Sequence, residues 1–115
     1  MPLPLMLVTS DYKLNRAVFT QAIRMLRPAY DVREVVPEEM DAAVRSGRPW
    51  LVICSSVTTT IEALVPAWIL LPLEGHEQAA VSVHGRRRDL PIPPLEDVLS
   101  LIDELWTTVA PQFPR

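Results

Sequence analysis

The chain has 115 residues, of which 49% are hydrophobic and 22% charged, and 11 basic against 14 acidic side chains give a formal net charge of -3. These values exclude collagen-like, disordered and toxin-like classes, and they predict one small soluble domain over residues 1–115. The acidic balance argues against nucleic-acid binding, because contact with phosphate needs a basic surface.

Cysteine occurs once, at Cys54, so a disulfide within the chain and a metal site built on several thiolates are excluded. His76 and His84 lack partners at metal-ligand spacing, and only three glycines are present, so we expect no metal and no other cofactor. The N-terminus lacks the features of a signal peptide, and no apolar run approaches the roughly 20 residues needed to cross a membrane. We therefore expect a cytoplasmic protein without membrane contact.

The first half of the chain alternates strands and helices. Three segments have the length and apolar or β-branched character of strands: 3–9, 31–36 and 50–55. Two helices are predicted between them: 13–27, which ends before Pro28, and 37–47. In the first helix, spacings of three and four place a set of apolar residues on one stripe that should face the core: Leu14, Val18, Ala22, Met25 and Leu26. This alternation predicts a parallel sheet.

The second half follows a different pattern. Residues 58–64 allow two helical turns before Pro66. Two strand-like segments, 67–73 and 79–83, are joined by too few residues for a crossover helix, so we expect an antiparallel hairpin. A final helix has an apolar face and an opposite acidic face: Leu95, Val98, Leu99, Ile102, Leu105 and Trp106 against Glu96, Asp97, Asp103 and Glu104.

These elements predict a three-layer, flavodoxin-like α/β fold. Its parallel strands should run in the order 2-1-3, extended by the antiparallel hairpin and closed by the final helix. Ligands of such sheets bind beyond the carboxyl ends of the strands, where the strand order reverses. Here that point lies between the first and third strands, beside Ser10, Asp11, Ser55 and Ser56.

The strand–helix alternation, with a closing helix at 95–99 behind a proline, resembles the receiver domains of bacterial response regulators in outline over most of the chain. That family holds Mg²⁺ and a phosphoryl group with an acidic pair after the first strand, Asp after the third, Ser or Thr after the fourth and Lys after the fifth. Here residues 9–11 supply one acid, residues 54–56 supply none, and the only lysine is Lys13. The resemblance implies a degenerate receiver that acts by contact and not by phosphorylation.

The segment 54–60 suggests an alternative. A cysteine at a strand end, followed by hydroxyls and backbone N–H groups at a helix start, can hold a small anion and lower the thiol pKa. The segment is similar to the phosphocysteine loop of the B components of the sugar phosphotransferase system, where Thr follows Cys by six residues, as Thr60 does here. It has Val57 where that family usually has Gly, and Thr60 where low-molecular-weight tyrosine phosphatases need Arg.

We favour a purely structural interpretation of this segment, in which Cys54 is a buried core residue and the Ser/Thr run caps a short helix. If the segment does bind a ligand, the candidate residues are Ser10, Asp11, Cys54, Ser55, Ser56 and Thr58. A Ser55, His84 and Asp11 triad is also conceivable, since all three lie near predicted strand ends.

Arg86, Arg87 and Arg88 form the basic cluster of the chain. The cluster is typical of a solvated loop, although guanidinium groups could bind phosphate, an acidic peptide or an acidic helix face. Because the predicted hairpin leaves an edge strand, we hypothesise a twofold homodimer that uses the hairpin and the final helix, with these arginines meeting acids of the partner. The leading hypothesis is a non-catalytic signalling or protein-interaction module. The alternative is a small enzyme or phosphocarrier that uses Cys54.

Overall fold

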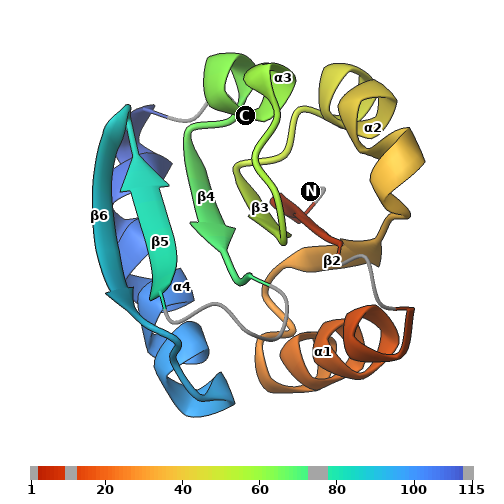
Figure 1. Cartoon of the computed structure of the whole chain (residues 1–115), viewed down its shortest axis with the longest axis vertical. Coiled ribbons are helices and arrows are strands. Elements are labelled where there is room, and N and C mark those ends of the chain that lie inside the picture. Colours follow the sequence, from red (N-terminus) through yellow and green to blue (C-terminus); the bar gives the residue numbers. More distant parts are fainter. Residues whose placement is uncertain (1–2, 10–12, 73–77, 113–115) are drawn as a thin grey trace.

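The computed structural model describes residues 3–9, 13–72 and 78–112 (Figure 1). Its elements, in chain order, are β1 (Leu5–Val8), α1 (Lys13–Leu26), β2 (Asp31–Glu34), α2 (Met40–Gly47), β3 (Leu51–Cys54), α3 (Thr59–Leu64), β4 (Ala67–Leu70), β5 (Gln78–Val83), β6 (Arg86–Pro91) and α4 (Leu95–Val109). Short 3-10 turns at Pro37–Glu39 and Ala110–Gln112 precede α2 and follow α4. Every strand and helix predicted from the sequence is present, with ends that differ by a few residues, and β6 is additional.

The strands form a six-stranded sheet in the order β2-β1-β3-β4-β5-β6. Strands β2, β1, β3 and β4 are parallel, whereas β5 is antiparallel to β4 and β6 is antiparallel to β5. The predicted 2-1-3 order and the predicted antiparallel pair, now β4 and β5, are both confirmed. The short link between β4 and β5 explains their direction, because a parallel crossover needs about a dozen residues.

The solvated loop expected at Arg86–Arg88 is wrong, since these residues begin strand β6. His84 and Gly85 make a two-residue turn with φ values of 50° and 81°. Two left-handed residues in succession are typical of the type I′ turn that joins tight hairpins, and glycine adopts such angles without strain. Val83 and Arg86 pair across the turn. Three adjacent arginines fit in a strand here because β6 is an edge strand and their side chains remain exposed.

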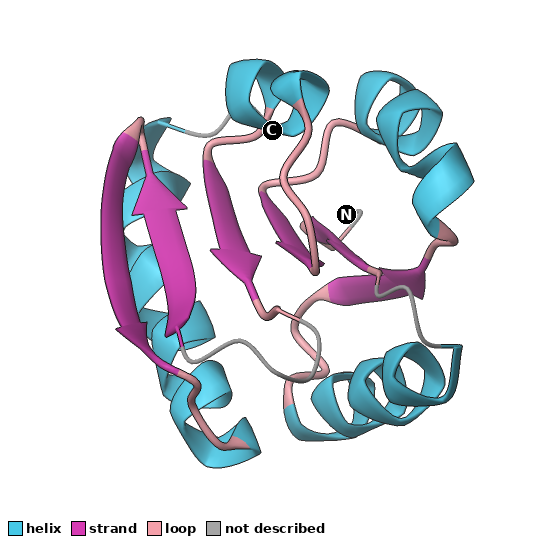
Figure 2. Cartoon of the chain, in the orientation of Figure 1, coloured by secondary structure: helices cyan, strands magenta, loops and turns pink. Residues whose placement is uncertain are grey.

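Helices cover both faces of the sheet, which gives the predicted three layers (Figure 2). Helices α1 and α4 pack on one face, called here the α1/α4 face, where Val8, Ile53 and Ile69 lie. Helices α2 and α3 pack on the other, called the α2/α3 face, where Leu7 and Val52 lie. Side chains of a strand alternate between the two faces, so the continuous apolar runs of β1 and β3 reflect burial on both sides.

An aromatic cluster joins the sheet to α4. Trp50, which is fully buried, lies 5.4 Å from Tyr30 and 4.9 Å from Trp106 between ring centroids. The Tyr30 and Trp106 rings are 5.7 Å apart in an edge-to-face arrangement. Aromatic pairs at these separations are favourable beyond the area they bury. The cluster therefore fixes the position of α4, and with it one wall of the groove described below.

The apolar stripe predicted for α1 faces solvent, which corrects the prediction. Val18, Met25 and Leu26 are 61%, 70% and 51% exposed, and Leu14 lies outside the described side chains. The helix instead packs through Ile23, which is fully buried, with Phe19 against the same cluster.

Helix α4 has the predicted orientation, with its apolar residues in the core and its acids exposed. Asp103 accepts hydrogen bonds from Nε and Nη2 of Arg27, both at 2.8 Å, and these bonds hold α4 against the end of α1. In the described part of the chain, no helix is long and apolar enough to span a bilayer.

Candidate functional site

Cys54 lies at the carboxyl end of β3, next to Thr9 at the end of β1. The register pairs Val8 with Ile53, and the backbone N–H of Thr9 donates to the Ile53 carbonyl at 2.8 Å, so Thr9 and Cys54 follow as neighbours. The thiol is 1% exposed and lies 3.9 Å from the Ile69 carbonyl oxygen. Burial raises the pKa of Cys54 to about 12, against a smaller lowering by the backbone of Ser56. The thiol is therefore protonated at neutral pH, unlike the reactive cysteine of an anion loop.

The threonines after Cys54 hold two helices together. Thr58 caps α3, because its Oγ1 accepts a hydrogen bond from the backbone N–H of Ile61 at 3.1 Å. The same hydroxyl donates to Asp41 Oδ1 of α2 at 2.8 Å. Thr60, which is buried, accepts from the Arg45 guanidinium at 3.2 Å. These hydroxyls are thus engaged in packing α2 against α3.

Only some of the other ligand residues predicted from the sequence lie in the part of the chain that the structure describes. Ser55 is half-buried and Ser56 is exposed, whereas Ser10 and Asp11 lie outside the described residues. Thr9 was not among the predicted ligand residues, yet its Oγ1 is buried without a hydrogen-bond partner in the described structure. Within that same part of the chain, no three His, Cys, Asp or Glu side chains are grouped as metal ligands.

His84 lies beside the amino-terminal end of β4, whereas Ser55 follows the carboxyl-terminal end of β3. Ser55 and His84 therefore lie at opposite ends of the strands and do not form the triad considered from the sequence. The reason is the direction of β5: its carboxyl end adjoins the start of β4, and the His84 N–H donates to the Pro66 carbonyl at 2.8 Å.

The two outer edges of the sheet differ. At β2, the Arg24 guanidinium donates to the outward Val32 carbonyl from Nε at 3.1 Å and from Nη2 at 2.7 Å. At β6, no described side chain bonds to the outward backbone groups. Unpaired strand edges are the usual templates for pairing with another chain. The open edge of the sheet is therefore β6.

The hairpin turn determines which backbone groups of β6 point outward. Residues that flank a two-residue turn form a hydrogen-bonded pair, so Arg86 bonds to Val83 and, by alternation, Arg88 and Leu90 also bond to β5. Arg87 and Asp89 consequently direct their N–H and C=O groups away from the sheet. Pro91, the next residue in this series, lacks an N–H, which fits an outward position.

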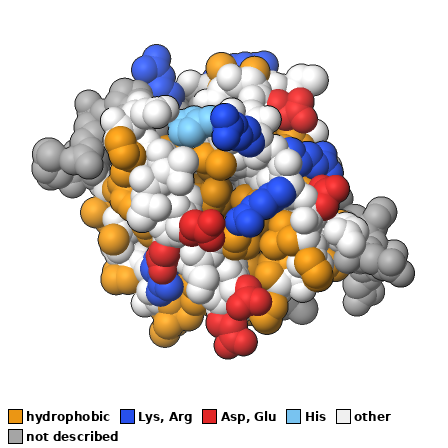
Figure 3. Space-filling view, turned by 90° about the vertical axis from the view of Figure 1, so that its left-hand side faces the viewer, with side chains coloured by type: hydrophobic (Ala, Val, Ile, Leu, Met, Phe, Trp, Pro, Cys, Tyr) orange, Lys and Arg blue, Asp and Glu red, His pale blue; other side chains and the backbone are white. Residues whose placement is uncertain are grey.

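Charged side chains of both signs surround this edge (Figure 3). On the α2/α3 face, Arg87 pairs with Asp89 at 3.2 Å, and its guanidinium lies 5.8 Å from the Trp68 ring centroid. On the α1/α4 face, Arg88 pairs with Glu104 of α4 at 3.6 Å. Arg86 makes no ion pair with any residue that the structure describes. The hypothesis from the sequence was that these arginines pair with acids of a partner chain. In the structure, Arg87 and Arg88 pair with acids of their own chain.

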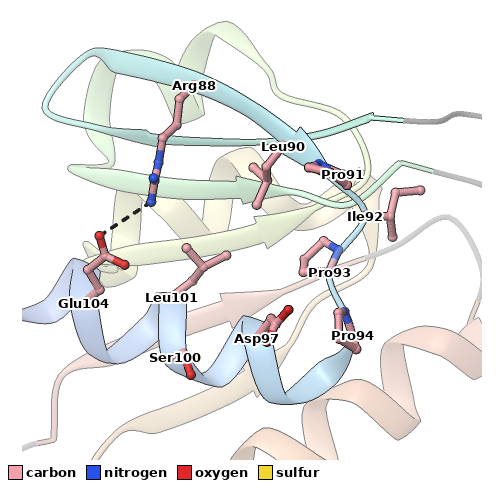
Figure 4. Close-up of a pocket in the computed structure, with 10 residues that line it drawn as sticks. All are labelled: Arg88, Leu90, Pro91, Ile92, Pro93, Pro94, Asp97, Ser100, Leu101 and Glu104. Atoms are coloured by element: carbon pink, nitrogen blue, oxygen red, sulfur yellow. Dashed lines mark ion pairs between the residues drawn. The ribbon is translucent and has the colours of Figure 1, made fainter.

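A groove of about 550 Å³ lies between β6 and the start of α4 (Figure 4). Leu90 and Leu101 form its apolar floor, and the proline-rich link 91–94 closes one end. The ion pair of Arg88 and Glu104 lies at the other end, and Asp97 lies on the helix side. The groove and the open edge of β6 are together called the β6 surface below. The sequence predicted an edge strand beside the final helix, but neither strand β6 nor the groove. They depend on contacts between strand and helix residues far apart in the chain.

The sequence matches no protein-family profile and no curated protein significantly. In structure, the chain is similar to a methionyl-tRNA formyltransferase from Clostridium thermocellum, with a TM-score of 0.57 and 11% sequence identity. The match covers 92% of this chain and 66% of that one, slightly under two thirds of its length. The fold is mixed α/β, of the flavodoxin-like or Rossmann-like kind. At this identity the likeness concerns the fold alone.

Proposed function

We propose that this chain is a non-catalytic protein-interaction module that binds its partner through the β6 surface. The observation that carries the proposal is the open edge at Arg87 and Asp89 beside a groove with an apolar floor. An extended segment added to a sheet edge gains affinity from main-chain hydrogen bonds and specificity from pockets that take every second side chain. The groove lies on one face of β6, where it would receive those alternate side chains.

The resemblance to receiver domains supports a role in signalling by contact. The parallel strands β2, β1, β3 and β4 follow each other across the sheet, and helices cover both faces. That family places carboxylates after the first and third strands. Here Thr9 directly follows β1 and Cys54 ends β3. We infer a single domain on a receiver-like scaffold, working in a reducing cytoplasm without phosphorylation chemistry.

The alternative function, an enzyme or phosphocarrier based on Cys54, has less support. Burial raises the pKa of the Cys54 thiol to about 12, and the hydroxyl that caps the short helix α3 already bonds to Ile61 and Asp41. Formyl transfer is not proposed either, because the likeness to the formyltransferase is one of fold.

Selection of displayed random peptides against the whole chain tests the proposal. Arg87→Pro removes an outward N–H without removing a bond to β5, and Ser100→Trp fills the groove from an exposed position on α4. Ser56→Trp, at the carboxyl edge of β3, is the matched control. We expect selected peptides to bind the wild type and Ser56→Trp equally, and to lose at least about tenfold in affinity for the two β6-surface variants.

The proposal is wrong if no peptide depends on β6, or if Ser56→Trp is the variant that loses binding. Circular dichroism of each variant separates a lost surface from a lost fold, and Ser100→Trp leaves β6 itself unchanged.

A further inference from the structure

We propose that the partner of the β6 surface is a second copy of this chain, joined by antiparallel pairing of the two β6 strands about a twofold axis at Arg88. This inference rests on the proposed function, because it uses the same surface. It adds the identity of the partner and the register of the contact.

The backbone restricts the possible registers. Only residues with both an outward N–H and an outward C=O can exchange two hydrogen bonds across the new contact, and in β6 these are Arg87 and Asp89, since Pro91 lacks an N–H. With the axis at Arg88, Arg87 lies opposite Asp89 of the second copy, and Asp89 lies opposite Arg87 of the second copy. Each of these pairs exchanges both of its N–H···O bonds. An axis between two residues would place outward groups opposite inward ones and break this pattern.

Charge then selects among the remaining registers. With the axis at Arg88, the two symmetric pairs of Arg87 with Asp89 place opposite charges side by side on the α2/α3 face. With the axis at Arg87, two copies of Arg87 would face each other, and with the axis at Asp89, two carboxylates would do so. Opposite charges directly across strands are stabilising and like charges are destabilising. The sequence Arg87-Arg88-Asp89 is therefore self-complementary in one register.

The α1/α4 face agrees with this register. There Arg86 lies opposite Leu90 of the second copy. Leu90 lines the groove of that second copy, and the lining of the groove also includes Asp97 and Glu104. Arg86 has no ion pair with the described residues of its own chain, so those acids offer it a partner. The two Arg88 side chains face each other at the axis, and the ion pair of each with its own Glu104 reduces their repulsion.

A disulfide across the axis tests the register directly. Residues opposite each other in a non-hydrogen-bonded pair have Cα atoms about 4.5 Å apart, within the range that a disulfide spans. Arg88→Cys should therefore form an interchain disulfide under mild oxidation. Arg86→Cys is the matched control, because its own copy lies four residues further along, about 13 Å away. Cys54 stays in both variants, since it is buried.

Charge exchange tests the pairing without a new bond. Arg87→Asp should weaken the dimer by about tenfold or more, because it replaces two attractive pairs with two repulsive ones. The double variant Arg87→Asp with Asp89→Arg restores opposite charges in the same register and should recover the dimer. The readout is mass by sedimentation equilibrium, which distinguishes 13.0 kDa from twice that value.

The inference is overturned if the wild type stays monomeric at millimolar concentration, or if Arg86→Cys cross-links as readily as Arg88→Cys. It is also overturned if the double variant stays as weak as Arg87→Asp. If the chain is monomeric but still binds selected peptides at β6, self-association is wrong and the proposed function is supported. A dimer that forms equally well in Arg87→Pro uses another surface and removes the self-association at β6, whereas loss of all peptide binding at β6 removes the proposed function.

Discussion

Arg88 of β6 and Glu104 of α4 form an ion pair at 3.6 Å across the groove that separates the strand from the helix. Their side chains are 60% and 66% exposed, so water screens the attraction. The pair therefore contributes to the charge of the groove and little to the fold. Its neighbour on α4, Asp103, is different, because it binds the less exposed Arg27 through two hydrogen bonds.

We predict that Glu104→Gln changes the free energy of unfolding by less than about 0.5 kcal/mol, whereas Asp103→Asn lowers it by about 0.5–1 kcal/mol. Urea denaturation of the two variants provides the comparison. A larger loss for Glu104→Gln than for Asp103→Asn would show that the groove pair is structural.

The two faces of α1 give a second prediction. Met25→Gln should change the free energy of unfolding by no more than about 0.5 kcal/mol, because Met25 is 70% exposed. Ile23→Ala should lower it by about 2–5 kcal/mol, because that side chain is fully buried against the sheet. If Met25→Gln proved the more damaging of the two, the orientation of α1 described above would be wrong.

This helix shows why the fold was more predictable than the details. Two apolar sets in α1 have helical spacing, and periodicity alone does not tell which one faces the core; the longer set, with Val18 and Met25, faces solvent. Strand β6 was missed for a related reason. Its arginines lack an apolar pattern, and the strand exists because its backbone pairs with β5.

The candidate site was predictable only where local chemistry decides it. A free cysteine inside an apolar run predicts burial, and Cys54 is indeed buried. A threonine before a helix predicts a cap, which Thr58 provides. The groove could not be predicted, because Leu90 and Leu101 meet only after the sheet and α4 have assembled.

The cap leads to a third prediction. Thr58→Ala should lower the free energy of unfolding by about 1 kcal/mol, since it removes the bonds to the Ile61 N–H and to Asp41. Thr59→Ala is the matched control, because Thr59 is exposed on the same helix, and it should have an effect below about 0.5 kcal/mol. Equal effects would mean that the hydroxyl of Thr58 is free for another role.

The fourth prediction concerns alkaline pH. Because burial raises the pKa of Cys54 from 9.0 to about 12, the unfolded chain loses this proton at a lower pH than the folded chain does. Stability from this group is complete below pH 9 and is lost as pH rises toward 12, by at most about 1.4 kcal/mol per pH unit. Burial also raises the pKa of Tyr30, which acts in the same direction.

The comparison of wild type with Cys54→Ala isolates the cysteine, since Tyr30 is common to both. We expect the wild type to lose stability more steeply above pH 9, measured by urea denaturation across the pH series. Parallel curves, or rapid labelling of the folded wild type by a chromogenic disulfide at neutral pH, would show that the thiol is accessible.

The most direct measurement of the central claim is amide hydrogen exchange at β6, followed by NMR as protein concentration is raised. The N–H groups of Arg86 and Arg88 bond to β5 and should be protected at every concentration. Those of Arg87 and Asp89 point outward, so they should exchange freely when dilute and become protected as chains associate. Free exchange at Arg87 and Asp89 at all concentrations, and also with selected peptides present, would contradict a binding role for this edge.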